Sequence, residues 1–211
     1  MKKSLFLLLL FLATSSAYSE SDSLLVLQCF ENYREALTEE KGDEAVKYLD
    51  SNTIRYYEDI LEKTIYLDST RLANEGLMDK LMIILLRAKI PKEEILKMDG
   101  KSLIIYSINN GMTGTSSIRK FQIGTVIVVK DHAEGFVISN EKTIPIPFRF
   151  NKENGAWKLD ITSILKLSEM GITLLLQKKG MTEEDFIKIS IILAAGSNTT
   201  VDPWQPLLKK E

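Results

Sequence analysis

The N-terminal part of the chain places apolar residues every three or four positions, the spacing of helices that bury one face. Ser23 is a suitable N-cap for the first such stretch, and Pro91 ends the fourth because proline cannot continue a helix. The stretches predict helices at 23–37, 43–49, 51–65, 77–89 and 92–98.

After Gly100 the apolar period changes from 3.6 residues to 2, which indicates strands. The alternation predicts antiparallel strands with one buried face, and Asn154-Gly155 predicts a tight turn between the last two. Pro145 and Pro147 imply that the fourth strand lies at an edge or carries a bulge, since proline donates no ladder hydrogen bond. The expected strands are 103–108, 121–130, 134–139, 143–150 and 156–162.

The chain returns to helical spacing at 164–178 and 183–195. The second of these helices is apolar nearly all round, and we expect it to be buried. The predicted fold class is therefore α+β, with N-terminal helices packed on a curved antiparallel sheet and additional C-terminal helices. The expected core contains Phe30, Leu49, Leu61, Ile105, Ile127, Phe148, Trp157, Leu159 and Ile191.

The first residues have the order of a secretory signal: Lys2 and Lys3, an apolar core at 5–13, and a small polar stretch at 14–19. Cleavage after Ala17 or after Ser19 satisfies the small-x-small rule, and residues 1–17 are taken as the signal peptide. The apolar core is too short to span a bilayer, so no transmembrane segment is expected in the mature chain. We expect an exported protein, periplasmic or secreted.

Residues 18–211 are predicted to form one domain, with a core at 24–164 and a C-terminal helical extension at 165–211. The 27 basic and 29 acidic residues form no basic cluster, which argues against nucleic acid as a partner. Cys29 is the only cysteine, so no intramolecular disulfide can form, and its apolar helical surroundings predict a buried thiol.

The final predicted hairpin reads PFRFNKENGAWKLDIT. With the helices that precede the sheet, it resembles the nuclear transport factor 2-like superfamily, a cone-shaped fold shared by ketosteroid isomerases and many exported proteins. The resemblance covers roughly residues 24–164 and implies a cavity on the concave face of the sheet. We expect Tyr106, Phe148 and Trp157 to line it. The helical segment at 77–98 or the C-terminal part could cover its open end.

No catalytic residue, cofactor or metal site is assigned. His132 is the only histidine, is expected in an exposed turn, and has no ligand partners at metal-binding spacing. Cone-fold isomerases use a carboxylate base with an acid and a tyrosine. The chain contains such residue types, but none aligns with a catalytic position. Asp160 should point away from the core, and Glu58 and Asp59 should lie on the solvated side of a helix.

The preferred functional interpretation is a non-catalytic exported protein that binds a partner protein or a small apolar ligand, with a homodimer through the sheet as one arrangement. One alternative is a cone-fold enzyme that acts on a small apolar molecule. Another is a membrane-surface protein that uses Phe186 to Leu193. The tail at 202–207 either staples the C-terminus onto the body through Trp204 and Leu207 or docks a partner through Trp204.

Overall fold

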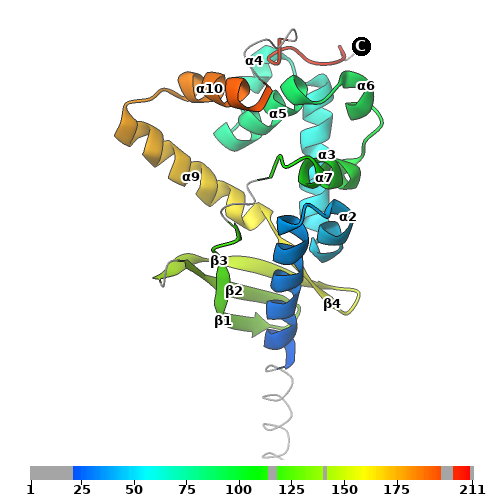
Figure 1. Cartoon of the computed structure of the whole chain (residues 1–211), viewed down its shortest axis with the longest axis vertical. Coiled ribbons are helices and arrows are strands. Elements are labelled where there is room, and N and C mark those ends of the chain that lie inside the picture. The colour runs from blue at the N-terminus through cyan, green and yellow to red at the C-terminus, as the bar shows by residue number, and fades with distance from the viewer. Residues whose placement is uncertain (1–20, 114–117, 140–141, 196–201, 210–211) are drawn as a thin grey trace, which may run out of the picture. The chain divides into compact units, whose positions relative to one another are not determined.

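The computed structural model describes residues 21–113, 118–139, 142–195 and 202–209. The predicted signal peptide, residues 1–17, lies outside the described residues. The chain divides into two compact units (Figure 1). The sheet unit consists of Met1–Asp50 and Ser107–Ile161, and the helical unit consists of Ser51–Tyr106 and Thr162–Glu211. The expectation of one domain at 18–211, with a core at 24–164 and an extension at 165–211, stays a prediction.

The sheet unit contains a four-stranded antiparallel sheet in the order β1-β2-β3-β4. Its strands are β1 (Gln122–Val129), β2 (His132–Ser139), β3 (Lys142–Glu153) and β4 (Ala156–Asp160). A helix at 21–38 precedes α2 (Gly42–Ala45) and the 3-10 helix η1 (Val46–Tyr48). With the helical unit described below, the predicted α+β class is confirmed.

The hairpin turns follow the sequence signals. Asn154 and Gly155 adopt positive φ values of 51° and 79°, which a tight turn between β3 and β4 requires. The prolines of β3 lie before Arg149–Glu153, the part of the strand that pairs with β4, so they are at a local edge of the sheet as well as at a bulge. Pro147 pairs with Phe136, where the register of the β2–β3 ladder shifts.

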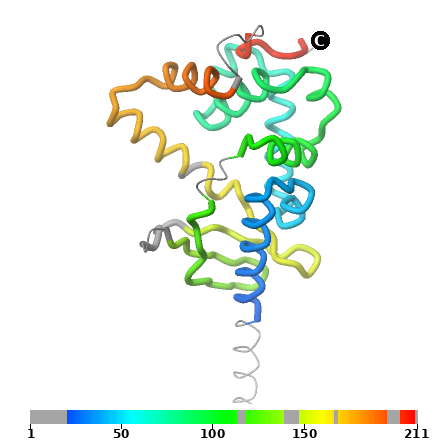
Figure 2. The backbone as a smooth tube through the Cα atoms, in the orientation of Figure 1, coloured from blue at the N-terminus to red at the C-terminus, as the bar shows by residue number. Residues whose placement is uncertain are grey.

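One face of the sheet is filled by aromatic and aliphatic side chains. Phe148, Phe150, Trp157 and Leu159 are buried there. The helix at 21–38 lies across this face (Figures 1 and 2), and its Phe30 ring centre lies 5.5 Å from that of Phe148. Alternation along β3 and β4 therefore builds the core of this unit.

The helical unit contains most of the described helices. Its elements are α3 (Ser51–Tyr66), α4 (Ser69–Leu72), α5 (Leu77–Lys89), α6 (Lys92–Ile95), the start of α7 (Gly100–Asn109), α9 (Thr162–Lys179) and α10 (Glu183–Ala195). Apart from α7, these correspond to helices expected from the sequence or to short turns between them.

The strand predicted at 103–108 is wrong, because these residues belong to helix α7. Leu103, Ile104 and Ile108 are buried at helical spacing, and a short apolar run does not distinguish this pattern from a buried strand. Asp99 and Ser102 form a reciprocal cap, in which the Ser102 amide donates to Asp99 Oδ1 at 2.7 Å and the Asp99 amide donates to Ser102 Oγ at 2.8 Å. Gly100 therefore begins a helix and does not end one.

Most of the expected core is buried: Phe30, Leu49, Leu61, Phe148, Trp157 and Leu159. Ile105 and Ile191 are only half-buried, and Ile127 is 49% exposed, so the predictions of these three as core residues were wrong. Ile127 points outward because the register shifts between Ile123 and Val126, which moves every later side chain of β1 to the other face.

Asp160 was expected to point to solvent, but it is buried. Its side chain points to the face of the sheet opposite to that of Leu159, as alternation along a strand requires. The segment around Leu49 runs alongside this end of β4, where Leu49 forms a parallel bridge with Leu159 and the Asp50 amide donates to the Leu159 carbonyl at 3.1 Å. Glu58 and Asp59 are exposed as expected. Cys29 is buried as expected, and burial raises the pKa of its thiol to about 12, which leaves it protonated and unreactive.

Candidate functional site

The residues predicted to line a cavity fall in both units. Phe148 and Trp157 lie on the filled face of the sheet, whereas Tyr106 belongs to the helical unit and lies half-buried on α7. Phe148 contacts a second ring, that of Phe121, at 6.1 Å between centres. Both sheet residues thus serve core packing, and a ligand role for the three residues stays a prediction.

Trp157 also takes part in a polar contact that sequence reasoning missed. Its indole N–H donates to Asp22 Oδ1 at 2.9 Å, and Lys152 Nζ lies 2.8 Å from the same oxygen. These donors, Lys152 first, hold the pKa of Asp22 below its usual range. The contact ties the start of the first helix to the last hairpin, so its role is structural.

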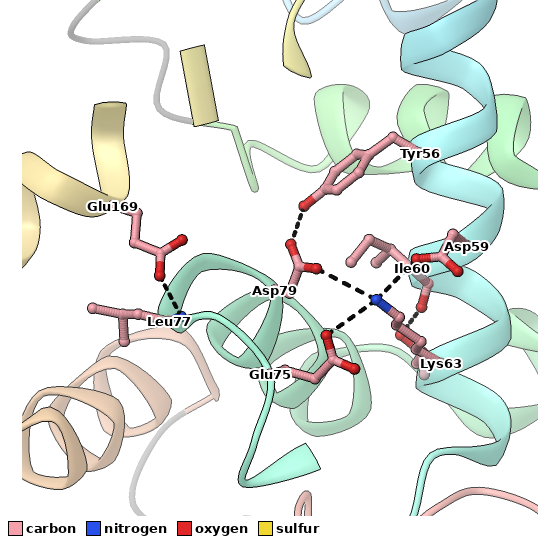
Figure 3. Close-up of polar contacts among 9 residues, drawn as sticks. Tyr56, Asp59, Ile60, Lys63, Glu75, Leu77, Asp79 and Glu169 are labelled. Carbon is pink, nitrogen blue, oxygen red and sulfur yellow. Dashed lines mark hydrogen bonds and ion pairs between the residues drawn. The ribbon is translucent and has the colours of Figure 1, made fainter. Parts of the chain in front are cut away.

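A polar cluster in the helical unit is the first candidate for chemistry (Figure 3). Tyr56 on α3 donates its hydroxyl to Asp79 Oδ1 on α5 at 2.6 Å. Lys63, two turns further along α3, lies 2.9 Å from Asp59, 3.1 Å from Glu75 and 3.5 Å from Asp79. We call these five residues the Lys63 cluster.

The protonation states of the Lys63 cluster do not suit acid–base catalysis. Burial, and then the hydrogen bond to Asp79, raise the pKa of Tyr56. Burial alone would lower the pKa of Lys63, but Asp59 and Glu75 outweigh it and raise the pKa. Both groups therefore keep their protons at neutral pH, whereas a general acid or base works best with a pKa near the operating pH.

The ammonium group of Lys63 stands where the three carboxylates converge, and so it fills the position a bound cation would take. Within the described ranges, no group of three or more His, Cys, Asp or Glu side chains is arranged to hold a metal. His132 is exposed as expected, at the start of β2, and its Nδ1 lies 2.7 Å from Asn151 Oδ1. The Lys63 cluster is best described as an ion network that joins α3 to α5.

A second polar feature, centred on Arg87 of α5, holds the C-terminal tail. Arg87 is only 2% exposed, and its five N–H groups all have acceptors. They donate to the carbonyl oxygens of Thr64 (2.8 Å), Lys63 (3.0 Å), Leu67 (2.7 Å), Pro203 (3.3 Å) and Trp204 (3.3 Å). A cation at the carbonyl end of α3 is stabilised by the helix dipole.

The tail therefore lies on the helical unit, as the staple interpretation expects. The amide of Leu208 donates to the carbonyl of Ile65 at 2.9 Å, and Pro203 is buried. The expected anchors, Trp204 and Leu207, are only half-buried. The main anchor is Arg87, which sequence reasoning missed because a single arginine in an apolar helix carries no signal of its distant carbonyl partners.

The third feature is apolar and lies on the last two helices. The run from Phe186 to Ala195 was expected to be buried, but among residues 186–194, whose burial the structure describes, only Ile187, 1% exposed, reaches the core. Among the side chains of α9 and α10 whose burial is described, the exposed large apolar ones are Met170 (56%), Leu174 (64%), Leu175 (50%), Ile189 (43%), Ile192 (54%) and Leu193 (82%). We call these six residues the C-terminal apolar surface.

The burial prediction for α10 failed because packing one face of a helix buries only one stripe of it. Ile187 supplies that stripe on α10, and Leu176, 7% exposed, is buried on α9. Apolar residues on the remaining faces then stay in water. A helix that is apolar all round is therefore not necessarily a core helix.

A scan against protein-family models, a search of curated proteins and a search of solved structures each found no match to the chain. Among the described helices, none combines the length and the apolar character needed to cross a membrane.

Proposed function

We propose that the chain is an exported, non-catalytic binding protein whose partner protein docks on the C-terminal apolar surface. The observation that carries the proposal is the exposure of the six large apolar side chains on α9 and α10, with Leu193 the most exposed at 82%. Soluble proteins tend to expose large apolar side chains singly, and groups of them mark sites of interaction.

The spacing of the exposed residues supports a protein partner. Met170 and Leu174 are four positions apart on α9, and Ile189 has Ile192 and Leu193 three and four positions beyond it on α10. Residues at these spacings share one side of a helix, the pattern with which helices enter a groove on another protein. A small apolar ligand would require a concave pocket instead of a helix face.

Two further features support a non-catalytic role within a cone-like fold. The side chains of Phe148 and Phe150 occupy the sheet face on which a cone-fold enzyme would need an open cavity. Tyr56 and Lys63 in the Lys63 cluster keep their protons at neutral pH. Membership of the nuclear transport factor 2-like superfamily remains part of the proposal, supported by the hairpin sequence and by helices that precede the antiparallel sheet.

Export is proposed from Lys2, Lys3 and the apolar core at 5–13. N-terminal sequencing of the protein recovered from its own cell tests it directly. Cleavage after Ala17 gives a chain that starts at Tyr18, and cleavage after Ser19 gives one that starts at Glu20. A chain that retains Lys2 and remains inside the cytoplasm would contradict export.

Docking is tested by a photo-crosslinking residue placed at Leu193, with Lys97 as the control position because it is exposed and belongs to neither α9 nor α10. We expect one protein to crosslink at Leu193 and not at Lys97. The identified partner, once purified, should bind the wild-type chain and should not bind the variant with Leu174→Ser, Ile192→Ser and Leu193→Ser. Equal binding to that variant would overturn the proposal.

A membrane surface is the second candidate occupant, favoured by the apolar exposure of α10 itself. Glu183, Glu184 and Asp185 in the first turn of that helix oppose an anionic lipid surface, which is why the protein partner is preferred. Co-sedimentation of the wild-type chain with anionic vesicles, lost in the triple-serine variant, would replace the protein partner by a membrane. A crosslink between two copies of the chain would identify the partner as a second copy of the same chain, which makes the assembly a homodimer.

A further inference from the structure

A groove of about 510 Å³ lies between the link that joins α5 to α6 and the C-terminal tail. Residues 87–92 form one wall, and Asp202, Gln205, Pro206 and Leu207 form the other. Figure 1 shows the tail, in red, close to α6. The volume is within the range of about 300–1,000 Å³ in which proteins bind small molecules.

The charges that line the groove favour an anion. Among the described residues that line the groove, Arg87, Lys89 and Lys92 are basic and only Asp202 is acidic. Lys89 and Lys92 are exposed, and the ion pairs of the described residues include neither of them. Asp202 also accepts the amide of Trp204 at 3.0 Å, which holds it in the tail.

Arg87 contributes charge to this groove but no free donor. All of its N–H groups are used by backbone carbonyls, which carry no net charge. Burial lowers the pKa of its guanidinium to about 10, against the opposing effect of Asp202, so it remains charged at neutral pH. A ligand anion would therefore bind the two lysines, with Arg87 as a fixed positive charge behind them.

The rest of the lining is apolar and comes from Ala88, Ile90, Pro91, Pro206 and Leu207. A small hydrophilic anion would leave these side chains uncovered, and an uncharged apolar molecule would leave the lysines without a partner. We propose that the groove binds a small amphiphile with one anionic head group. The head group pairs with Lys89 and Lys92, and the chain of the amphiphile lies against Pro91, Pro206 and Leu207.

Calorimetric titration of the mature chain with decanoate, kept below its micelle concentration, tests the ligand class. We expect saturable binding at one site. Acetate, which has the head group alone, and decanol, which has the chain alone, should each bind at least tenfold more weakly. If acetate binds as tightly as decanoate, the apolar lining does not contribute to binding. If decanol binds as tightly as decanoate, the anionic head group does not contribute. Either result would overturn the proposal of an anionic amphiphile.

The site is located by comparing two double variants. Lys89→Gln with Lys92→Gln should weaken decanoate binding about tenfold, as expected for the loss of two exposed charge pairs. Lys97→Gln with Lys101→Gln removes the same charge from exposed positions outside the groove and should leave binding unchanged. Equal weakening by both variants, or binding that neither changes, would overturn the proposal. Its outcome is independent of docking on the C-terminal apolar surface.

Discussion

The sheet unit and the last two helices of the helical unit use apolar residues in opposite ways. Phe150 and Leu159 in the sheet unit are 0% and 1% exposed, whereas Leu174 and Leu193 on α9 and α10 are 64% and 82% exposed. The apolar side chains of the sheet face contribute to folding because they leave water when the chain folds. Those of α9 and α10 contribute little until something covers them.

The difference follows from how each element is covered. A sheet with one face packed against a helix buries every second residue of its strands, and β3 and β4 place large apolar residues at those positions. A packed helix buries one stripe, so a helix that is apolar on several sides retains exposed apolar surface. Apolar content alone therefore does not separate residues that stabilise the fold from residues available to a partner.

The largest expected effect is the difference in the free energy of unfolding between a variant in the sheet core and a variant on α10. Phe150→Ala should lower the free energy of unfolding by about 3–5 kcal/mol, because it leaves a cavity in the sheet core. Leu193→Ala should change it by less than about 0.5 kcal/mol, because the side chain is already in water. Denaturant unfolding of both variants measures the difference. A loss above about 1 kcal/mol for Leu193→Ala would mean that α10 is covered in the isolated protein.

Loss of the Arg87 anchor should have the next largest effect. Arg87→Met should lower the free energy of unfolding by about 3 kcal/mol, because it removes charged hydrogen bonds and leaves carbonyls at the end of α3 without a donor. Arg71→Met is the control, since Arg71 is 61% exposed and pairs only at the surface with Asp68, an interaction worth less than about 1 kcal/mol. Equal losses in the two variants would show that the tail is not held through Arg87.

Sequence patterns predicted the parts of the fold that depend on neighbouring residues. The Asn154-Gly155 turn and the alternation of β3 are local signals, and both predictions were confirmed. The outward position of Ile127 depends on the bulge between Ile123 and Val126, which no local pattern marks. Helix α7 was missed because the apolar run after Gly100 fits both the 3.6-residue period of a helix and the 2-residue period of a strand. The spacing of Asp99 and Ser102 was a capping signal that favoured the helix.

The candidate sites were less accessible to prediction because their contacts join distant parts of the chain. The partners of Arg87 lie on α3 and in the tail. The Lys63 cluster joins Lys63 to Glu75 and Asp79 across two helices. Nothing in the spacing of these residues shows that they meet. The apolar character of α10 was visible in the sequence, but which of its faces is covered depends on the packing of the whole unit.

Asp22 allows a pH test of the sheet unit. Its folded pKa is depressed below 3.8, so the stability that its charge contributes is present above pH 3.8 and is lost as the pH falls through the folded value. Asp22→Asn should therefore lower the free energy of unfolding at pH 7 by about 1–2 kcal/mol, which thermal unfolding detects as a lower Tm. The difference in Tm between the wild type and the variant should shrink below pH 3.8. Asp131→Asn, which removes a carboxylate from an exposed turn of the same unit, is the matched control. A difference that stays constant down to pH 2 would contradict the role of the charge.

Tyr56 gives the smallest effect and tests the helical unit at the opposite end of the pH scale. Tyr56→Phe should lower the free energy of unfolding by about 1 kcal/mol at pH 7, because one hydrogen bond to Asp79 is lost. The pKa of Tyr56 is raised in the folded chain, so Tyr56 ionises first in the unfolded chain as the pH rises above 10.0. This ionisation lowers the free energy of unfolding of the wild type. It has no counterpart in Tyr56→Phe, because the variant has no hydroxyl at this position. Urea unfolding at pH 7 and at pH 11 measures both effects. The gap between wild type and Tyr56→Phe should narrow at the higher pH, and a gap that widens there would show that Asp79 does not hold the phenol in its neutral form.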